Sequence, residues 1–293
     1  MSAALPAFLL EAVFYLASLF KETRAWFARF RPARGQACLL WLSAIAPYLA
    51  FSLSAGTFQR NGFYLLAALT AILAFWFAVL PRRAAYDFGF LVVAAAPVLM
   101  GVFQRIYQPP DQALRGIEIL GHVMWIRLGI AALLVLREWD PGAFGLWPRA
   151  REWRLGSLYY LAALIPIILL ALALHDVRFA PLRGDWWRVA GIGIGTFFGI
   201  LWVVALSEEL FFRGVIERAL LDNGWRSPVA VVLSAVLYGS AHLWVHAFPN
   251  WRHAAVVTLL GLACGMAYAQ SGSVRTPMVT HAFMVATWRV FFK

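Results

Sequence analysis

The sequence predicts an all-α fold, a polytopic transmembrane helix bundle with about eight to ten membrane helices. The chain is 62% hydrophobic and only 13% charged, whereas soluble domains are roughly half apolar and a quarter charged. Uncharged runs of about 20 residues, the length that crosses a bilayer as a helix, recur along it. The basic residues are mostly arginines between these runs. These observations exclude an ordinary soluble domain.

The elements follow in order along the chain. Six apolar runs are clear candidates for membrane spans, at 37–56, 62–80, 155–174, 189–207, 229–247 and 254–270. Four further runs are interrupted: 4–20 by Glu11, 88–104 by Pro97, 117–136 by Glu118 and Arg127, and 276–292 by Arg289. We expect no signal peptide, because positive charge comes only after the first apolar run.

The charge balance predicts membrane topology and not nucleic-acid binding. The chain has 25 Lys and Arg against 14 Asp and Glu, a net charge of +11. The basic cluster at 21–34 should be cytoplasmic, since positive residues are enriched on that side, and those at 82–83 and 137–154 agree. We therefore expect an integral membrane protein that contacts anionic lipids and binds no nucleic acid.

The connection 137–154, rich in proline and glycine, is the best candidate for a linker. It divides the chain into residues 1–150, with few ionisable groups in their apolar runs, and residues 151–293, where such groups cluster. We expect any chemistry in the second part.

The strongest functional signal is Ser-Glu-Glu-Leu-Phe-Phe-Arg at 207–213, directly after an apolar run. A charged side chain at membrane depth costs about 2.5–3.5 kcal/mol, so these groups need partners. Arg213 lies four positions after Glu209 and four before Glu217, so it can pair with either. Glu208 points about 100° away and has no local cation, which makes it the candidate general base. The alternative is a helix end with solvated charges.

Two histidines lie in later apolar runs. His242 shares a helical face with Tyr238, and the small residues between them allow another helix to come close. His242 is either a hydrogen-bonded core residue or a proton acceptor, and His246 repeats the four-residue spacing of a metal pair that lacks a third ligand. His281 follows Thr280 near the start of the last run.

The glutamate pair, the arginine and the two histidines form a set suited to activating water. Simple alternation of spans places Glu208 and His281 toward the cytoplasmic side but His242 toward the other. We expect a deeper or broken helix to bring them together, because isolated charges at these depths have no other compensation.

These residues resemble the CAAX-endopeptidase and bacteriocin-processing-enzyme (CPBP, or Abi) family of intramembrane proteases. Its motifs are EExxxR, FxxxH and HxxxN on successive transmembrane helices. The first is complete at 208–213, and the second is met by His242 with Tyr238 in place of phenylalanine. The third keeps His281 but has Val285 in place of asparagine.

The resemblance covers about residues 155–290. It implies an intramembrane protease domain at 151–293, with 1–150 as an accessory N-terminal transmembrane region. The implied activity is a CAAX-type endopeptidase, related to CAAX prenyl proteases, acting on a peptide or lipidated protein at the membrane. Extended members resemble proteins linked to bacterial exosortase sorting systems, which implies a bacterial cytoplasmic (inner) membrane.

The resemblance also implies roles. Glu208, assisted by His242, takes a proton from the attacking water, with Glu209 in the same catalytic set, and His281 orients water or stabilises the oxyanion. Arg213 is structural and electrostatic.

Val285 cannot donate a hydrogen bond, so one oxyanion donor is missing, and Tyr238 or Thr280 are candidates to replace it. Tyr238 otherwise has a structural role beside His242.

These residues leave the participation of Zn²⁺ open, because Glu208, His242 and His281 would form an acceptable zinc shell while the same atoms suffice for glutamate-activated water without a cofactor. One alternative is a catalytically silent scaffold or immunity protein of the same fold, which Val285 favours. Another is a haem or quinone electron carrier with facing histidines, which leaves the glutamates and the arginine unexplained.

Overall fold

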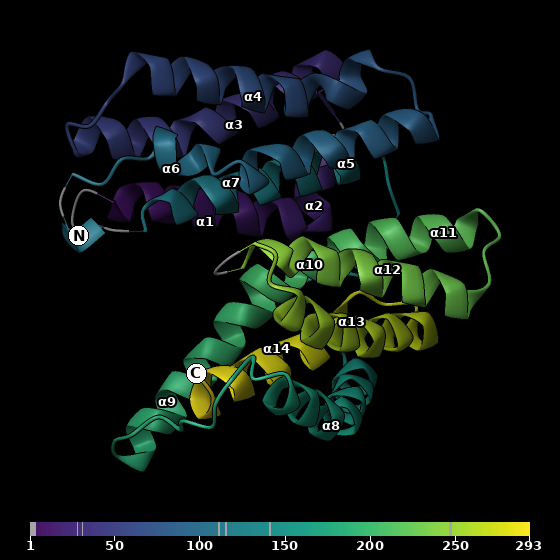
Figure 1. Cartoon of the computed structure of the whole chain (residues 1–293). Helices are drawn as coiled ribbons and strands as arrows, with labels where there is room; N and C mark the ends of the chain where they lie inside the picture. The colour runs from purple at the N-terminus through teal and green to yellow at the C-terminus, as the bar shows by residue number, and fades with distance from the viewer. Residues whose placement is uncertain are drawn as a thin grey trace. The chain divides into compact units, whose positions relative to one another are not determined.

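The computed structural model describes residues 4–27, 29–30, 32–110, 112–114, 116–140, 142–245 and 248–293. Within these ranges the chain is helical, with only two isolated β-bridges, so the predicted all-α class is confirmed. It divides into two units, Met1–Trp139 and Asp140–Lys293 (Figure 1). The dividing point lies in the connection 137–154, and the accessory role of the first part stays a prediction.

The first unit contains these helices: α1 (Leu5–Leu19), α2 (Lys21–Phe27), α3 (Ala33–Ser54), α4 (Arg60–Val79), α5 (Ala84–Leu99), α6 (Val102–Ile106), the 3₁₀ turn Gln112–Leu114, α7 (Glu118–Ala131) and its π-helical continuation Ala132–Leu136. The run 88–104 is not one helix as expected. Gly101 adopts a left-handed conformation (φ 61°) between α5 and α6, and such a glycine ends helices.

The ionisable groups inside the first unit form a structural pair. Arg127 of α7 lies 2.6 Å from the Glu11 carboxylate of α1 and donates to the Ser43 hydroxyl of α3 at 2.9 Å. The Glu11 and Arg127 side chains are each only 2% exposed. Because both charges are paired and hydrogen-bonded, they hold three helices together without needing water.

The second unit contains α8 (Ala150–Ala173), then one continuous helix from Trp186 to Asp222, then α12 (Ser227–Ala241), the 3₁₀ turn His242–Trp244, α13 (Trp251–Ser271) and α14 (Arg275–Phe291). The long helix is built from α9 (Trp186–Gly199), π-helical Ile200–Ala205, α10 (Leu206–Glu209), π-helical Leu210–Glu217 and α11 (Arg218–Asp222).

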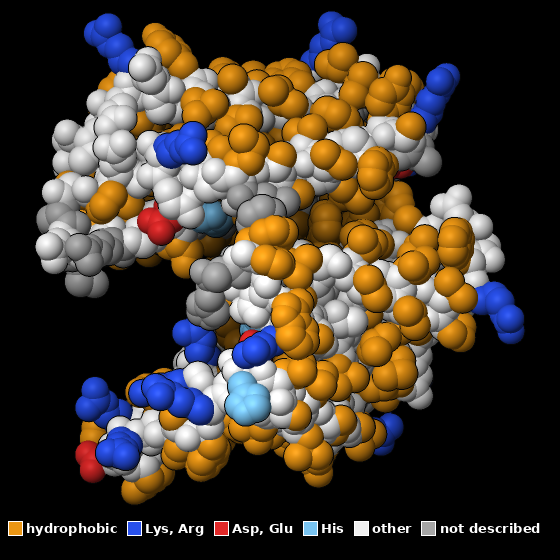
Figure 2. Space-filling model, viewed as in Figure 1, with side chains coloured by type: hydrophobic (Ala, Val, Ile, Leu, Met, Phe, Trp, Pro, Cys, Tyr) orange, Lys and Arg blue, Asp and Glu red, His pale blue; other side chains and the backbone are white. Residues whose placement is uncertain are grey.

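The outer surface of the helices is apolar. On α8, side chains spaced three or four positions apart are 56–66% exposed: Leu158, Leu161, Ile165 and Leu169. The opposite face of α8 packs into the unit core. Figure 2 shows apolar side chains spread over the visible face of each unit, with few charged ones between them. A surface of this kind is stable against lipid and not against water.

Six helices in the described part of the chain are long and apolar enough to cross a membrane: Ala33–Ser54, Arg60–Val79, Glu118–Leu136, Ala150–Ala173, Trp186–Asp222 and Trp251–Ser271. Three shorter apolar helices accompany them, Leu5–Ser18, Ala85–Val98 and Ser227–Ala241. The protein is an integral membrane protein. The total of eight to ten spans stays a prediction, because it depends on whether the shorter helices also cross the membrane.

Close helix approach in the second unit depends on two glycines. A Cβ at Gly156 of α8 would lie 2.6 Å from the Thr276 carbonyl oxygen of α14. A Cβ at Gly239 of α12 would lie 2.6 Å from the Ala254 carbonyl oxygen of α13. Small residues therefore set how near α14 and α12 come to their neighbours, and these two helices carry His281 and His242.

Candidate active site

The site is centred on His281, which lies between the two adjacent glutamates of the long helix. Its Nδ1 is 2.8 Å from Oε1 of Glu209, and its Nε2 is 4.0 Å from Oε2 of Glu208. The imidazole of α14 therefore contacts both carboxylates across the interface with α10. Because α10 and α14 are separated by two helices in the chain, only the tertiary fold produces this contact.

Arg213 fixes Glu209 from the other side. Its Nη1 lies 3.1 Å from Oε2 of Glu209, at the four-residue spacing that the sequence suggests, and its Nη2 donates to the Gly261 carbonyl of α13 at 2.8 Å. The guanidinium also lies 4.8 Å from the Tyr238 ring centroid. Since Arg213 and Glu209 are both 0% exposed, the pair is a fixed internal charge group that bridges three helices.

The two glutamates differ in access. The Glu208 side chain is 29% exposed, whereas that of Glu209 is 0% exposed. Oε2 of Glu208 is itself buried and has no hydrogen-bond partner among the described residues. Glu208 is thus the carboxylate that a substrate or water can reach, and Glu209 is a support for His281.

The second histidine lies at the end of α12. Nδ1 of His242 is 2.9 Å from the Tyr238 carbonyl oxygen, which satisfies one of the carbonyls left free at a helix C-terminus. α12 ends at Ala241, whereas the length of the apolar run suggested a helix to 247. The Tyr238 ring contacts both imidazoles, with its centroid 4.8 Å from that of His242 and 6.1 Å from that of His281.

The hydrogen bonds assign the protons on both rings. A carbonyl and a carboxylate paired with Arg213 only accept, so Nδ1 of His242 and of His281 must be the donor. Each neutral ring then presents Nε2 as an acceptor. At His281 this atom faces Glu208 over 4.0 Å, a separation at which a water molecule can bridge two polar groups.

Simple alternation of spans put His242 on the other side of the membrane from Glu208 and His281. The length of the helix that carries Glu208 removes this conflict. It continues to Asp222, fifteen residues beyond the run 189–207, so Glu208 lies within it and not at its end. The chain then turns and α12 runs back beside it, with Ser234 donating to the Phe212 carbonyl at 2.9 Å. His242 thereby returns to the level of Glu208.

Other sequence expectations differ from the structure. Arg213 pairs with Glu209 and makes no ion pair with Glu217, whose carboxylate oxygens have no hydrogen-bond partner among the described residues. Thr280 donates to the Gly156 carbonyl of α8 at 2.9 Å, so it does not face the glutamates. Glu208 forms no ion pair with His242, and its contact is with His281 instead. His246 lies outside the described residues.

The side chains of Glu208, His242 and His281 are not arranged as the ligands of one metal ion. Within the described ranges, no group of three or more His, Cys, Asp or Glu residues is positioned to hold a metal ion. Nδ1 of each histidine already has a hydrogen-bond partner, the Tyr238 carbonyl at His242 and the Glu209 carboxylate at His281. The zinc shell of Glu208, His242 and His281 therefore does not fit this arrangement.

Sequence reasoning missed a further histidine near His242, namely His253. His253 at the start of α13 lies 3.0 Å, through Nδ1, from the Asp176 carboxylate that follows α8. Its ring centroid is 6.0 Å from that of His242. The Asp176 and His253 positions are 77 residues apart, so no spacing pattern could have linked them.

Comparison with known families agrees with the geometry. Residues 186–287 match the family model described as type II CAAX prenyl endopeptidase Rce1-like. The family resemblance is confirmed. The Rce1-like match begins with α9 and extends into α14, so it contains Glu208, Glu209, Arg213, His242 and His281, whereas α8 and the first unit lie outside it. No curated protein and no solved structure matches the chain.

Proposed function

We propose that the second unit is an intramembrane endopeptidase that hydrolyses a peptide bond of a membrane-associated, prenylated or otherwise lipidated protein. At the level of the family, the chain is of the CAAX protease type. The observation that carries the proposal is the placement of His281 between an accessible and a buried glutamate, with the buried one held by Arg213.

In the proposed mechanism, Glu208 is the base. A water held between its carboxylate and Nε2 of His281 attacks the scissile carbonyl while Glu208 takes the proton. The proton then passes to the leaving amine, so no acyl-enzyme forms.

Glu209 and Arg213 are positioning residues in this scheme. Glu209 accepts the Nδ1 proton of His281 and so keeps its Nε2 toward the water, as carboxylate partners do for catalytic and metal-binding histidines. Arg213 fixes the position of the Glu209 carboxylate through their ion pair. His242 lies beyond Tyr238, where it can contact the substrate or leaving group and not the attacking water.

A catalytically silent protein of the same fold is the second candidate. Val285, partly buried one turn after His281, offers no donor where the family motif has asparagine. Thr280 cannot replace that donor, because its hydroxyl is bonded to α8. In this reading the chain binds or protects a membrane partner. We propose a bacterial cytoplasmic membrane as its location in either case.

The test is cleavage of a prenylated peptide that carries a fluorophore and a quencher on the two sides of a C-terminal CAAX-type sequence. The full chain is purified in detergent and reconstituted into vesicles. Glu208→Gln removes the base while keeping the shape, so turnover should fall at least a hundredfold, within the range of general-base contributions. The amount of folded protein should remain the same.

Asp222→Asn is the matched control. It changes a carboxylate on the same helix, in a surface pair with Arg218 that is worth about 0–1 kcal/mol. Activity of Glu208→Gln equal to that of the control refutes the assigned base. A wild-type rate that a chelator abolishes and Zn²⁺ restores replaces glutamate-activated water with metal chemistry. Absence of cleavage across varied prenylated peptides favours the silent protein.

A further inference from the structure

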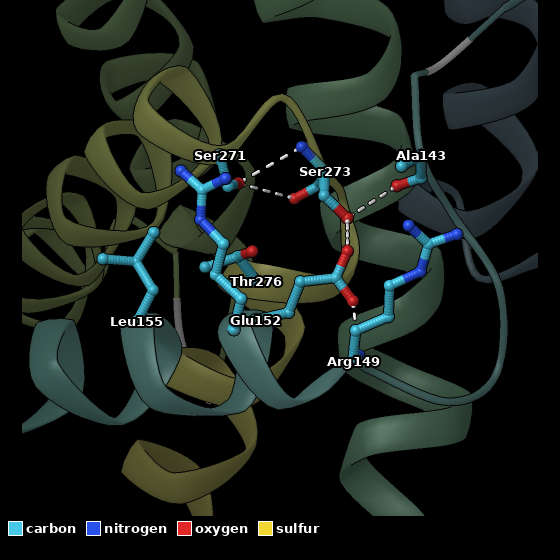
Figure 3. A pocket seen from close by; sticks show the side chains of 8 residues that line it. Ala143, Arg149, Glu152, Leu155, Ser271, Ser273 and Thr276 are labelled. Carbon is cyan, nitrogen blue, oxygen red and sulfur yellow. Dashed lines mark hydrogen bonds between the residues drawn. The ribbon is translucent and has the colours of Figure 1, made fainter.

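A polar cavity of about 170 Å³ lies at the start of α14 (Figure 3). It is formed where α8 and α14 begin and α13 ends. Its polar lining consists of the arginines 149 and 151, Glu152, the serines 271 and 273, and Thr276. None of them belongs to the proposed catalytic set.

One part of the cavity wall is a satisfied network. Glu152 accepts from the Ser273 hydroxyl at 2.7 Å, from the Arg275 guanidinium at 2.8 Å and from the Arg149 backbone amide at 2.6 Å. Ser271 accepts from the Ser273 amide at 3.2 Å. These bonds cap α8 and tie it to α14, so this part alone is explained by the fold.

The remaining groups are not explained by the fold. The Arg149 and Arg151 guanidinium groups have no hydrogen bond or ion pair in the described part of the chain, and both side chains are exposed at the cavity rim. Thr276 is 0% exposed, and its hydroxyl has no hydrogen-bond partner among the described residues. A buried hydroxyl without a partner costs about 1–3 kcal/mol unless something else binds it.

The electrostatics favour an anion. The one carboxylate in the lining, Glu152, is already paired with Arg275, so Arg149 and Arg151 leave the cavity with net positive charge. The N-terminal ends of α8 and α14 add the positive ends of two helix dipoles. Glu152 opposes binding close to its own oxygens, which places a ligand nearer to Arg149 and Arg151.

The surroundings identify the depth of the cavity. It lies where the apolar span of α8 begins, and two tryptophans flank Arg149 and Arg151 in the chain: Trp147, which is 59% exposed, and Trp153, whose ring meets that of Trp147 edge-on. Tryptophan is enriched at the level of lipid headgroups, and basic residues on the cytoplasmic side bind anionic headgroups. A phosphate group at this depth can come from a lipid.

We propose that this cavity binds a phosphate group, that of an anionic phospholipid headgroup. The phosphate oxygens accept from Arg149 and Arg151 and from the Thr276 hydroxyl, while the acyl chains lie along the apolar outer face of α8. The bound lipid fixes the start of α14, six residues before His281. The proposal does not depend on proteolysis, because it is tested by binding alone.

The experiment is native mass spectrometry of the full chain in neutral detergent. Phosphatidylglycerol is titrated, with phosphatidylcholine and inorganic phosphate as separate arms. We expect phosphatidylglycerol to bind at least tenfold more tightly than phosphatidylcholine. Arg149→Gln with Arg151→Gln should weaken it about tenfold or more, because one charge-assisted bond is worth about that factor. Arg154→Gln, an exposed arginine of the same helix outside the cavity, should not change it.

A second variant distinguishes loss of lipid binding from loss of the folded structure. Thr276→Val keeps the shape and removes the hydroxyl, so it should weaken phosphatidylglycerol binding severalfold while leaving thermal stability equal or higher. Inorganic phosphate that competes with the lipid supports the shared phosphate chemistry, and lipid binding without such competition assigns the site to the headgroup. Binding unchanged in both variants, or equal for the two lipids, overturns the proposal.

Discussion

The Arg213–Glu209 pair should stabilise the folded protein only while both charges are present. Either charge alone in the bundle should destabilise it. Both side chains are 0% exposed, and the charged groups are 3.1 Å apart. Nη1 and Nε of Arg213 have no well-aligned hydrogen bond, so the attachment to Glu209 is mainly Coulombic. Removing either partner leaves the other charge uncompensated in an apolar bundle.

Three variants measure this: Arg213→Met, Glu209→Gln and the double change. Each single change should destabilise the protein by about 3–5 kcal/mol, the usual cost of breaking a buried pair. The Gly261 carbonyl continues to hold the guanidinium in Glu209→Gln, so that variant should lie at the lower end. The double variant should be less destabilised than the sum of the singles by about 0.5–3 kcal/mol.

The assay is reversible unfolding of the full chain in mixed micelles by titration with sodium dodecyl sulfate, followed by circular dichroism. Asp222→Asn serves as the surface control, with a change within about 1 kcal/mol. Additive effects of the two single changes would refute the pairing as the source of stability. A double variant less stable than the sum of the singles would do so more strongly.

Three further predictions concern other parts of the chain. Val285→Asn should raise turnover of the prenylated peptide about tenfold if the missing donor limits an active enzyme; a rate that stays the same or falls argues against this. Gly156→Ala brings a Cβ within 2.6 Å of a backbone carbonyl of α14 and should cost about 1–3 kcal/mol in the micelle titration, whereas Gly191→Ala, with nothing within 4 Å, should not destabilise. Glu11→Gln should destabilise the first unit by about 3–5 kcal/mol by isolating Arg127, and wild-type stability of that variant would show that the 2.6 Å pair contributes nothing.

The sequence by itself determined the fold class and the resemblance to the CAAX protease family. Long uncharged runs must become helices in a bilayer, because no other backbone arrangement within one segment satisfies its own hydrogen bonds there. The motif at 208–213 and the two histidines identified the family, and the four-residue spacing of Glu209 and Arg213 predicted a contact that is local to one helix. Such features depend only on neighbours in the chain.

The tertiary structure decided how these residues meet. The uncharged run 189–207 suggested a helix end near Glu208, yet the helix continues because Glu209 and Arg213 are paired inside the bundle. A hydropathy profile scores each charged residue separately, so it cannot predict that two charges form a pair. The difference in access between the two glutamates depends in turn on which one faces His281 and Arg213, and that follows from how α14 packs against α10. Contacts between groups far apart in the chain are fixed by packing, about which the order of residues carries no local signal.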